Sequence, residues 1–118
     1  MQPKLKLIHS PDIDNLEKFN PDDPEKFSLL LQLFIIVEDN DSGESFDVTV
    51  CTPKWLTEHY NQDDIIVGAH HLIVFEYNYP NIVRRINKYL MHCSGNTWRE
   101  VAEKVGRLGK WEFEDYID

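Results

Sequence analysis

The sequence predicts an α+β fold in which an antiparallel β-sheet of about four to five strands, including a central hairpin, packs with about three α-helices. Two patterns carry this prediction. Stretches that alternate between apolar and polar residues come mostly early in the chain, whereas apolar residues spaced by three and four come mostly late. The length agrees with a single domain spanning residues 1–118, because a chain of this size can bury a core without metals or disulfides.

The N-terminal part predicts one strand followed by an ordered loop. Residues 4–9 alternate leucine with lysine, which is typical of a half-buried strand. Residues 10–26 hold three prolines and six acidic residues, with Ile13, Leu16 and Phe19 as apolar anchors. Because prolines at this density interrupt regular elements, we expect this segment to be mostly loop.

A central hairpin is expected next. Residues 27–38 are apolar on both faces, which is typical of a strand in the middle of a sheet that is at least partly covered on both sides. Residues 39–43 are of types that favour turns. Residues 45–51 then alternate cleanly, with Phe46 and Val48 directed inward. Together the three segments predict an antiparallel hairpin.

The first helix and the next strand follow this hairpin. Thr52 is a favoured N-cap residue, and Pro53 loses no hydrogen bond at the first helical position. Trp55 and His59 then fall on one face of the helix. After that helix, residues 71–77 alternate again and predict a strand.

Two further helices are predicted late in the chain. Pro80 begins the second, whose apolar residues recur at intervals of three and four as far as Cys93. Thr97, with Glu100 three residues later, forms a capping box for the third. Gly109 is expected to end that helix.

The C-terminal segment, residues 111–116, alternates aromatic and acidic side chains, which suits a short edge strand. We expect Trp111 and Phe113 to share the inward side and to pack on the core. The acidic side chains on the opposite side would then face a partner's arginines and lysines. Packing on the core and binding a partner do not exclude each other here, because Trp and Tyr also contribute strongly to protein interfaces.

Charge narrows the class of partner. The chain holds 12 Lys and Arg against 21 Asp and Glu, so its net charge is −9. Residues 84–110 carry seven basic and two acidic side chains, a local charge of +5, and the remainder carries −14. An acidic surface repels phosphate backbones, which argues against a nucleic-acid partner and favours a basic protein. The residues expected to bind that partner are Asp12, Asp14, Asp39, Asp41, Glu44, Glu112, Glu114, Asp115 and Tyr116.

Motifs for catalysis, metals or cofactors are missing from the sequence. Cys51 and Cys93 stand alone without a CxxC pair, so we expect them to be buried, reduced thiols. The histidines have neither HxH nor HExxH spacing. These features predict a protein that is not an enzyme and needs no cofactor. A small enzyme whose site combines distant residues, for example His59, His71 and Asp64, remains an alternative.

A membrane protein or an exported protein is not expected. The longest uninterrupted apolar run covers residues 33–37, far below the roughly 20 residues that cross a bilayer. The N-terminal residues also lack an apolar segment of signal-peptide length. Both observations favour a cytoplasmic protein without a membrane partner.

Five short blocks occur in order along the chain, at residues 10–13, 51–56, 71–74, 98–101 and 111–116. The most specific are Cys-Thr-Pro-Lys-Trp-Leu and Trp-Glu-Phe-Glu-Asp-Tyr. Together the blocks resemble the bacterial polymorphic-toxin immunity proteins of the immunity protein 8 family, over nearly the whole chain. The segment at residues 20–24 departs from that pattern, with two prolines and two acidic residues where the family is expected to have an aromatic side chain.

The resemblance implies a small cytoplasmic α+β protein, encoded beside a secreted toxin, that binds and neutralises the toxin's C-terminal domain. It implies no catalysis and no cofactor. It also implies structural roles for the motif residues: Thr52 and Pro53 would start a helix, and Trp55 and Trp98 would fill the core. A non-catalytic adaptor of an intracellular complex remains an alternative, because the same acidic and aromatic surface would serve it.

Overall fold

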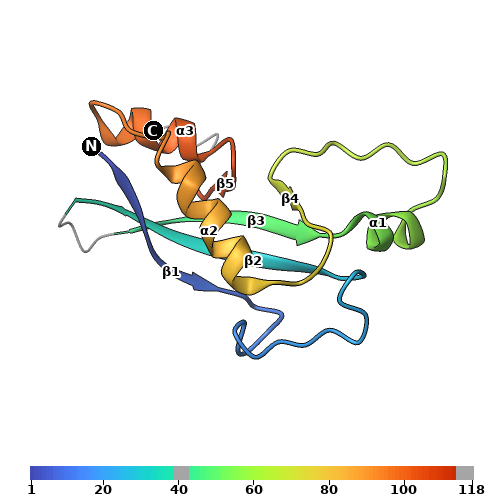
Figure 1. The fold of residues 1–118 in the computed structure, drawn as a ribbon. Coiled ribbons are helices and arrows are strands. Elements are labelled where there is room, and N and C mark those ends of the chain that lie inside the picture. The colour runs from blue at the N-terminus through green and yellow to red at the C-terminus, as the bar shows by residue number, and fades with distance from the viewer. Residues whose placement is uncertain (39–42, 114–118) are drawn as a thin grey trace.

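The computed structural model describes residues 1–38 and 43–113, and it confirms the α+β class (Figure 1). The strands are β1 (Pro3–His9), β2 (Ser28–Val37), β3 (Glu44–Cys51), β4 (His71–Ile73) and β5 (Lys110–Trp111). The helices in this part of the chain are α1 (Pro53–His59), α2 (Tyr79–Leu90) and α3 (Trp98–Val105).

The strands form one mixed sheet in the order β1-β2-β3-β4, with β5 also paired to β3. The central hairpin is confirmed, because β2 and β3 are antiparallel with Leu31 opposite Val48. In contrast to the wholly antiparallel sheet expected, β4 runs parallel to β3, with Val50 opposite Leu72. The physical reason is the connection between them: α1 and a long loop form a crossover, and a crossover returns the chain in the same direction.

The core lies between one face of the sheet and helices α2 and α3 (Figure 1). The inward residues of the hairpin are all buried, as their alternation predicts, and they include Leu31, Leu33, Ile35, Phe46, Val48 and Val50. The helices bury the stripes expected from their spacing, namely Ile82, Ile86 and Leu90 on α2 and Val101, Ala102 and Val105 on α3. The other face of β2 is more open, since Phe34 is exposed and Leu30 and Ile36 are half-buried.

The helix starts follow the predicted chemistry. The Thr52 hydroxyl accepts a hydrogen bond from the backbone N–H of Trp55, and the Thr97 hydroxyl accepts one from Glu100. The Glu100 carboxylate completes the cap by accepting from the backbone N–H of Asn96. Helix α3 ends earlier than expected, with Gly106 rather than Gly109 at its C-cap.

Two predicted strands are shorter than expected. The segment at 71–77 forms only the three residues of β4, after which Tyr77 leaves the sheet and donates its backbone N–H to the carbonyl of Pro24. Of the described residues in the segment at 111–116, only Trp111 belongs to β5. Gly109 brings β5 against β3, since a Cβ there would lie 3.1 Å from the Cβ of Phe46. Both strands lie along the same side of β3, so each can pair with only part of it.

Candidate partner-binding surfaces

Two of the acidic residues expected to bind a partner meet at the start of β3. The Trp111 indole donates to Glu44 with a nitrogen–oxygen distance of 3.0 Å. The backbone N–H of Ser45 donates to the Glu112 carboxylate at 3.1 Å, and the Glu112 N–H donates back to the Ser45 carbonyl. These contacts hold Glu44 and Glu112 side by side at one end of the sheet. The other candidates nearby in sequence, Asp39, Asp41, Glu114, Asp115 and Tyr116, lie outside the described residues.

The aromatic residues of this segment only partly follow the prediction. Trp111 is half-buried and stacks on Phe46, with ring centroids 6.3 Å apart. Phe113 does not pack inward: its side chain is 42% exposed and touches Trp111 by an edge contact. The reason is the short β5, which ends at Trp111 and so does not carry Phe113 along the sheet.

Asp12 and Asp14 lie in a different place. The Asp12 carboxylate accepts a hydrogen bond from the backbone N–H of Leu30, beyond the last β1–β2 pair. Asp14 is exposed in the same loop. Glu44 pairs with Ile35, five residues farther along β2, which corresponds to about 17 Å of strand. The structure therefore places the acidic candidates in two separate groups rather than in one patch.

A third surface is formed by residues 53–69, which we call the arm. The arm consists of α1 and the loop that leads toward β4, and Figure 1 shows it beyond the end of β3, apart from α2 and α3. No residue of the arm is buried. Trp55, expected to fill the core, is therefore only half-buried, whereas Trp98 does pack against the core. Helix α1 projects from the sheet, so its apolar face has no second layer to cover it.

Aromatic side chains of the arm contact one another. Trp55 stacks on His59 with ring centroids 4.3 Å apart, as residues four apart on a helix can do. Tyr60 makes edge contacts with both rings, at 6.0 Å to Trp55 and 4.8 Å to His59. The result is a small aromatic cluster built from one turn and a half of chain rather than from distant elements.

The loop of the arm exposes apolar side chains. Ile65 is 94% exposed and Val67 is 79% exposed. Of the 11 exposed large hydrophobic residues in the described part of the chain, six fall between residues 60 and 75: Tyr60, Ile65, Ile66, Val67, Ile73 and Phe75. The sequence reasoning missed this surface. The available signal was an Ile-Ile-Val run that belongs to no periodic segment.

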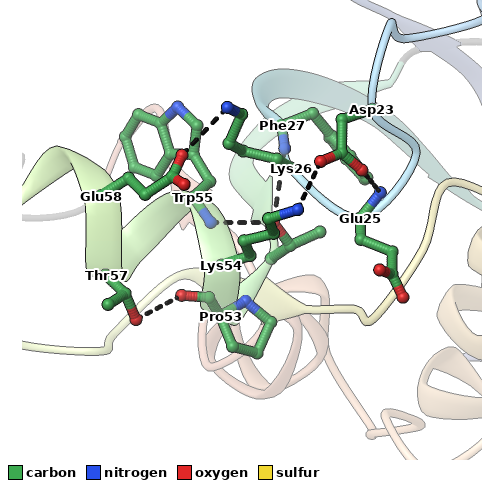
Figure 2. Close-up of polar contacts among 10 residues, drawn as sticks. Asp23, Glu25, Lys26, Phe27, Pro53, Lys54, Trp55, Thr57 and Glu58 are labelled. Atoms are coloured by element: carbon green, nitrogen blue, oxygen red, sulfur yellow. Dashed lines mark hydrogen bonds and ion pairs between the residues drawn. The ribbon is translucent and has the colours of Figure 1, made fainter.

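The base of the arm is tied to the sheet (Figure 2). The Thr52 hydroxyl is fully buried and accepts from the backbone N–H of both Trp55 and Phe27. Two ion pairs then join α1 to the loop before β2, Lys54–Asp23 at 2.6 Å and Lys26–Glu58 at 3.0 Å. The hydrogen bond from Lys54 lowers the pKa of Asp23, and the same contact raises the pKa of Lys54.

The far end of the arm is tied as well. His70 adopts a positive φ of 60° and donates from Nε2 to the carbonyl of Gly106, after α3. Its own carbonyl accepts from the backbone N–H of Thr49 on β3. Within the loop, Asn61 and Asp64 close a turn through two hydrogen bonds. The arm is therefore held in place at both ends even though it lacks a core.

The basic segment also becomes a surface in the fold. Arg85 and Lys88 from α2 and Lys104 and Arg107 from α3 and its end line a concavity of about 310 Å³, together with His92. No carboxylate lines it. The positive charge seen in the sequence is thus gathered beside α2 and α3.

The residues considered for chemistry do not assemble into a site. His59 stacks on Trp55, the His71 ring donates to the carbonyl of Ala69, and Asp64 accepts from the N–H of Asn61. No group of three or more His, Cys, Asp and Glu side chains suited to a metal occurs in the residues that the structure describes.

The two cysteines are free and buried, as predicted. Burial raises the pKa of both the Cys51 and the Cys93 thiol, which disfavours the reactive thiolate. Among the described helices, none has the length and apolar character to cross a bilayer.

Comparison with known proteins gives one match. A family model described as Immunity protein 8 matches residues 3–116, which is nearly the whole chain. No curated protein matches, and no solved structure matches.

Proposed function

The chain belongs to the immunity protein 8 family, and we propose that it binds a cognate secreted bacterial toxin and neutralises it by protein–protein contact. The observation that carries the proposal is the family match across residues 3–116. In this role the protein acts in the cytoplasm as a single domain, without catalysis and without a cofactor. It neutralises the toxin by binding the toxin's C-terminal domain.

The charge of the chain supports a basic toxin, such as a nuclease that must hold phosphate. A protein of net charge −9 attracts such a toxin over distance and raises the association rate, up to about 10⁸–10⁹ M⁻¹s⁻¹ in steered complexes. In this proposal the contacting residues are Glu44 and Glu112, which lie at one end of the sheet. Asp39, Asp41, Glu114, Asp115 and Tyr116 belong to the same proposal but lie outside the described residues. Asp12 and Asp14 form a second acidic group.

Co-expression with the toxin encoded by the neighbouring gene tests the function directly. Growth is expected to be rescued by the wild-type protein and not by an empty vector. If growth stays inhibited while both proteins are soluble, the immunity proposal fails.

The contribution of charge to toxin binding is tested by measuring the association rate at different salt concentrations. Raising salt from about 50 mM to about 500 mM shortens the Debye length from about 14 Å to about 4 Å. Association is expected to slow at least tenfold, whereas dissociation changes little. Reversal of Glu112, Glu114 and Asp115 to Lys should slow association by a similar factor. Reversal of the exposed Glu17, Glu25 and Glu103 is the matched control of equal net charge. An association rate that does not depend on salt would contradict the proposal that charge speeds the binding of the toxin.

A further inference from the structure

We infer that the arm, residues 53–69, is the element that seats the toxin, with its exposed apolar loop at the centre of the contact. This inference rests on the proposed function and adds a second surface to it, at the end of β3 opposite to Glu44 and Glu112. The partner it fits is a protein surface that offers an apolar depression bordered by lysine or arginine.

Exposure of the arm is the first observation. Contiguous apolar side chains on the surface of a small protein mark interaction sites, because water contact with them is unfavourable. Ile65, Ile66 and Val67 form such a run, and none of them is buried. The core does not need them, since the sheet and the helices α2 and α3 are already packed together without the arm. A surface that contributes nothing to the core and exposes isoleucine and valine is explained by a partner that covers it.

The rigidity of the arm is the second observation. Thr52, the Lys54–Asp23 pair and His70 tie its two ends to the rest of the protein. The contacts among Trp55, His59 and Tyr60 hold the aromatic cluster in one arrangement. A surface that is ordered before binding loses less conformational entropy on association, and Trp and Tyr are the residues that most often dominate interface energy.

The surface continues past the arm. Phe75 is 75% exposed. With Leu72, Ile73 and Val74 it lines a mostly apolar groove of about 430 Å³ against Ile82 and Arg85 of α2. The groove begins three residues after the arm ends, so a bound toxin can reach both and insert an apolar side chain into it.

Charge decides between a toxin and a second copy of this chain. The arm carries Asp63 and Asp64, together with Glu58, which is paired with Lys26 outside the arm, and its one lysine is paired with Asp23, also outside the arm. In a two-fold dimer the same patch meets itself, which would bring these acidic side chains together. A basic toxin could instead contact the apolar side chains of the arm and pair its lysines and arginines with the acidic ones. The acidic arm therefore favours the toxin.

The test measures binding to the toxin domain encoded by the neighbouring gene, inactivated by substitution. The double variant Ile65→Ser and Val67→Ser removes apolar surface without changing charge. We expect its Kd to rise at least 100-fold, mainly through faster dissociation, while its melting temperature stays within about 2 °C of the wild type. The double variant Leu7→Ser and Met91→Ser removes exposed apolar side chains outside the arm, and it should bind within threefold of the wild type.

A second variant separates charge from apolar contact. Asp63→Asn and Asp64→Asn keep the acceptor oxygen that closes the turn with Asn61. They should slow association three- to tenfold and leave dissociation nearly unchanged.

The outcomes distinguish the two proposals. If the wild type binds the toxin and the Ile65→Ser, Val67→Ser variant binds within threefold of it, the arm is not the docking element and the immunity function stands. If the wild type does not bind the toxin, the proposed function fails and this inference fails with it. If the free protein is a dimer that the variant dissociates while toxin binding is unchanged, the occupant is a second copy and the inference is overturned.

Discussion

Strand β3 and the arm are both rich in apolar residues, yet the fold treats them in opposite ways. Val48 and Val50 on β3 are fully buried, whereas Ile65 and Val67 lie almost entirely in solvent fewer than 20 residues later. The difference is what lies opposite each segment. The inward side of β3 faces α2 and α3, and the arm extends beyond the sheet where no second layer exists (Figure 1). The apolar composition of a segment therefore indicates that its burial would be favourable. It does not indicate whether another part of the fold covers that segment.

The aromatic clusters of the two regions differ in the same way. Phe46 contacts Trp98 from α3 and Trp111 from β5, so that cluster joins segments about 50 and 65 residues apart in the sequence. The cluster of Trp55, His59 and Tyr60 lies within six residues. The first cluster is part of global folding, and the second organises only a local surface.

The largest effect is expected when one cluster residue is removed from each region. Phe46→Ala should lower the free energy of unfolding by about 3–5 kcal/mol, because a fully buried phenylalanine leaves a cavity. Trp55→Ala should lower it by only about 1 kcal/mol, since that side chain is half-buried and contacts no core residue. Urea unfolding of both variants measures the two values. Equal losses would mean that the arm belongs to the cooperative core.

The C-terminal aromatic pair provides an internal comparison of intermediate size. Trp111→Ala should cost about 2 kcal/mol, because it removes the stacking on Phe46 and the hydrogen bond to Glu44. Phe113→Ala should cost less than about 1 kcal/mol, because its side chain is 42% exposed and lies outside the core. Thermal unfolding of the two variants orders them. A larger loss for Phe113 than for Trp111 would contradict the placement of the tail.

Tyr77 links the core to the loop before β2, and its hydroxyl has a pH signature. The hydroxyl donates to the carbonyl of Leu16 at 2.6 Å, so Tyr77→Phe should cost about 1 kcal/mol near pH 7. Burial raises the pKa of Tyr77 to about 12, against 10.0 when unfolded. A raised pKa adds stability that is complete below pH 10 and is lost as the pH rises toward 12.

Stability measured from pH 8 to pH 12 checks this prediction. The difference between the wild type and Tyr77→Phe should shrink over the upper half of that range, because the phenylalanine variant has no group to ionise. A difference that stays constant to pH 12 would argue against a buried Tyr77 hydroxyl.

The smallest effect is expected at the exposed tether of the arm. Asp23→Asn removes the ion pair with Lys54 on the surface, where such pairs contribute little to stability. The pKa of Asp23 is lowered from 3.8, so its contribution is present above pH 3.8 and is lost as the pH falls below that value. The melting temperature near pH 7 should change by less than about 2 °C.

Limited proteolysis gives a second readout for the same variant. Cleavage within residues 53–69 should become faster in Asp23→Asn, because one connection between α1 and the loop before β2 is lost. Asp22→Asn, at an exposed neighbour of Asp23, is the control and should leave the cleavage rate unchanged. Unchanged cleavage in both variants would show that Thr52, His70 and the Lys26–Glu58 pair hold the arm without Asp23.

Local features of the fold were predictable because they depend on neighbours in the chain. The caps at Thr52 and Thr97 need only a hydroxyl and the next three backbone N–H groups, and both are present as expected. The alternation of residues 45–51 and the helical spacing after Pro80 likewise determine which side chains turn inward. The buried, free state of Cys51 and Cys93 followed from their apolar surroundings and the lack of a CxxC pair.

The candidate site was predictable only in part. The motif blocks indicated an immunity protein, and the family match agrees with that. The meeting of Glu44 with Glu112 was not predictable, because it depends on β5 pairing with β3 across more than 60 residues of sequence. The exposure of Trp55 was predicted wrongly, since an amphipathic helix looks the same in sequence whether or not a layer covers it.

By itself, then, the sequence determined the fold class, the positions of the main helices and the hairpin, and the strongly acidic balance. Tertiary structure alone decided that β4 lies parallel to β3, that β5 ends at Trp111, and that the arm remains uncovered. The physical reason is the range of the interactions. Capping and periodicity act within a few residues, whereas strand pairing and the covering of an apolar face depend on which distant segments reach the same place in the folded chain.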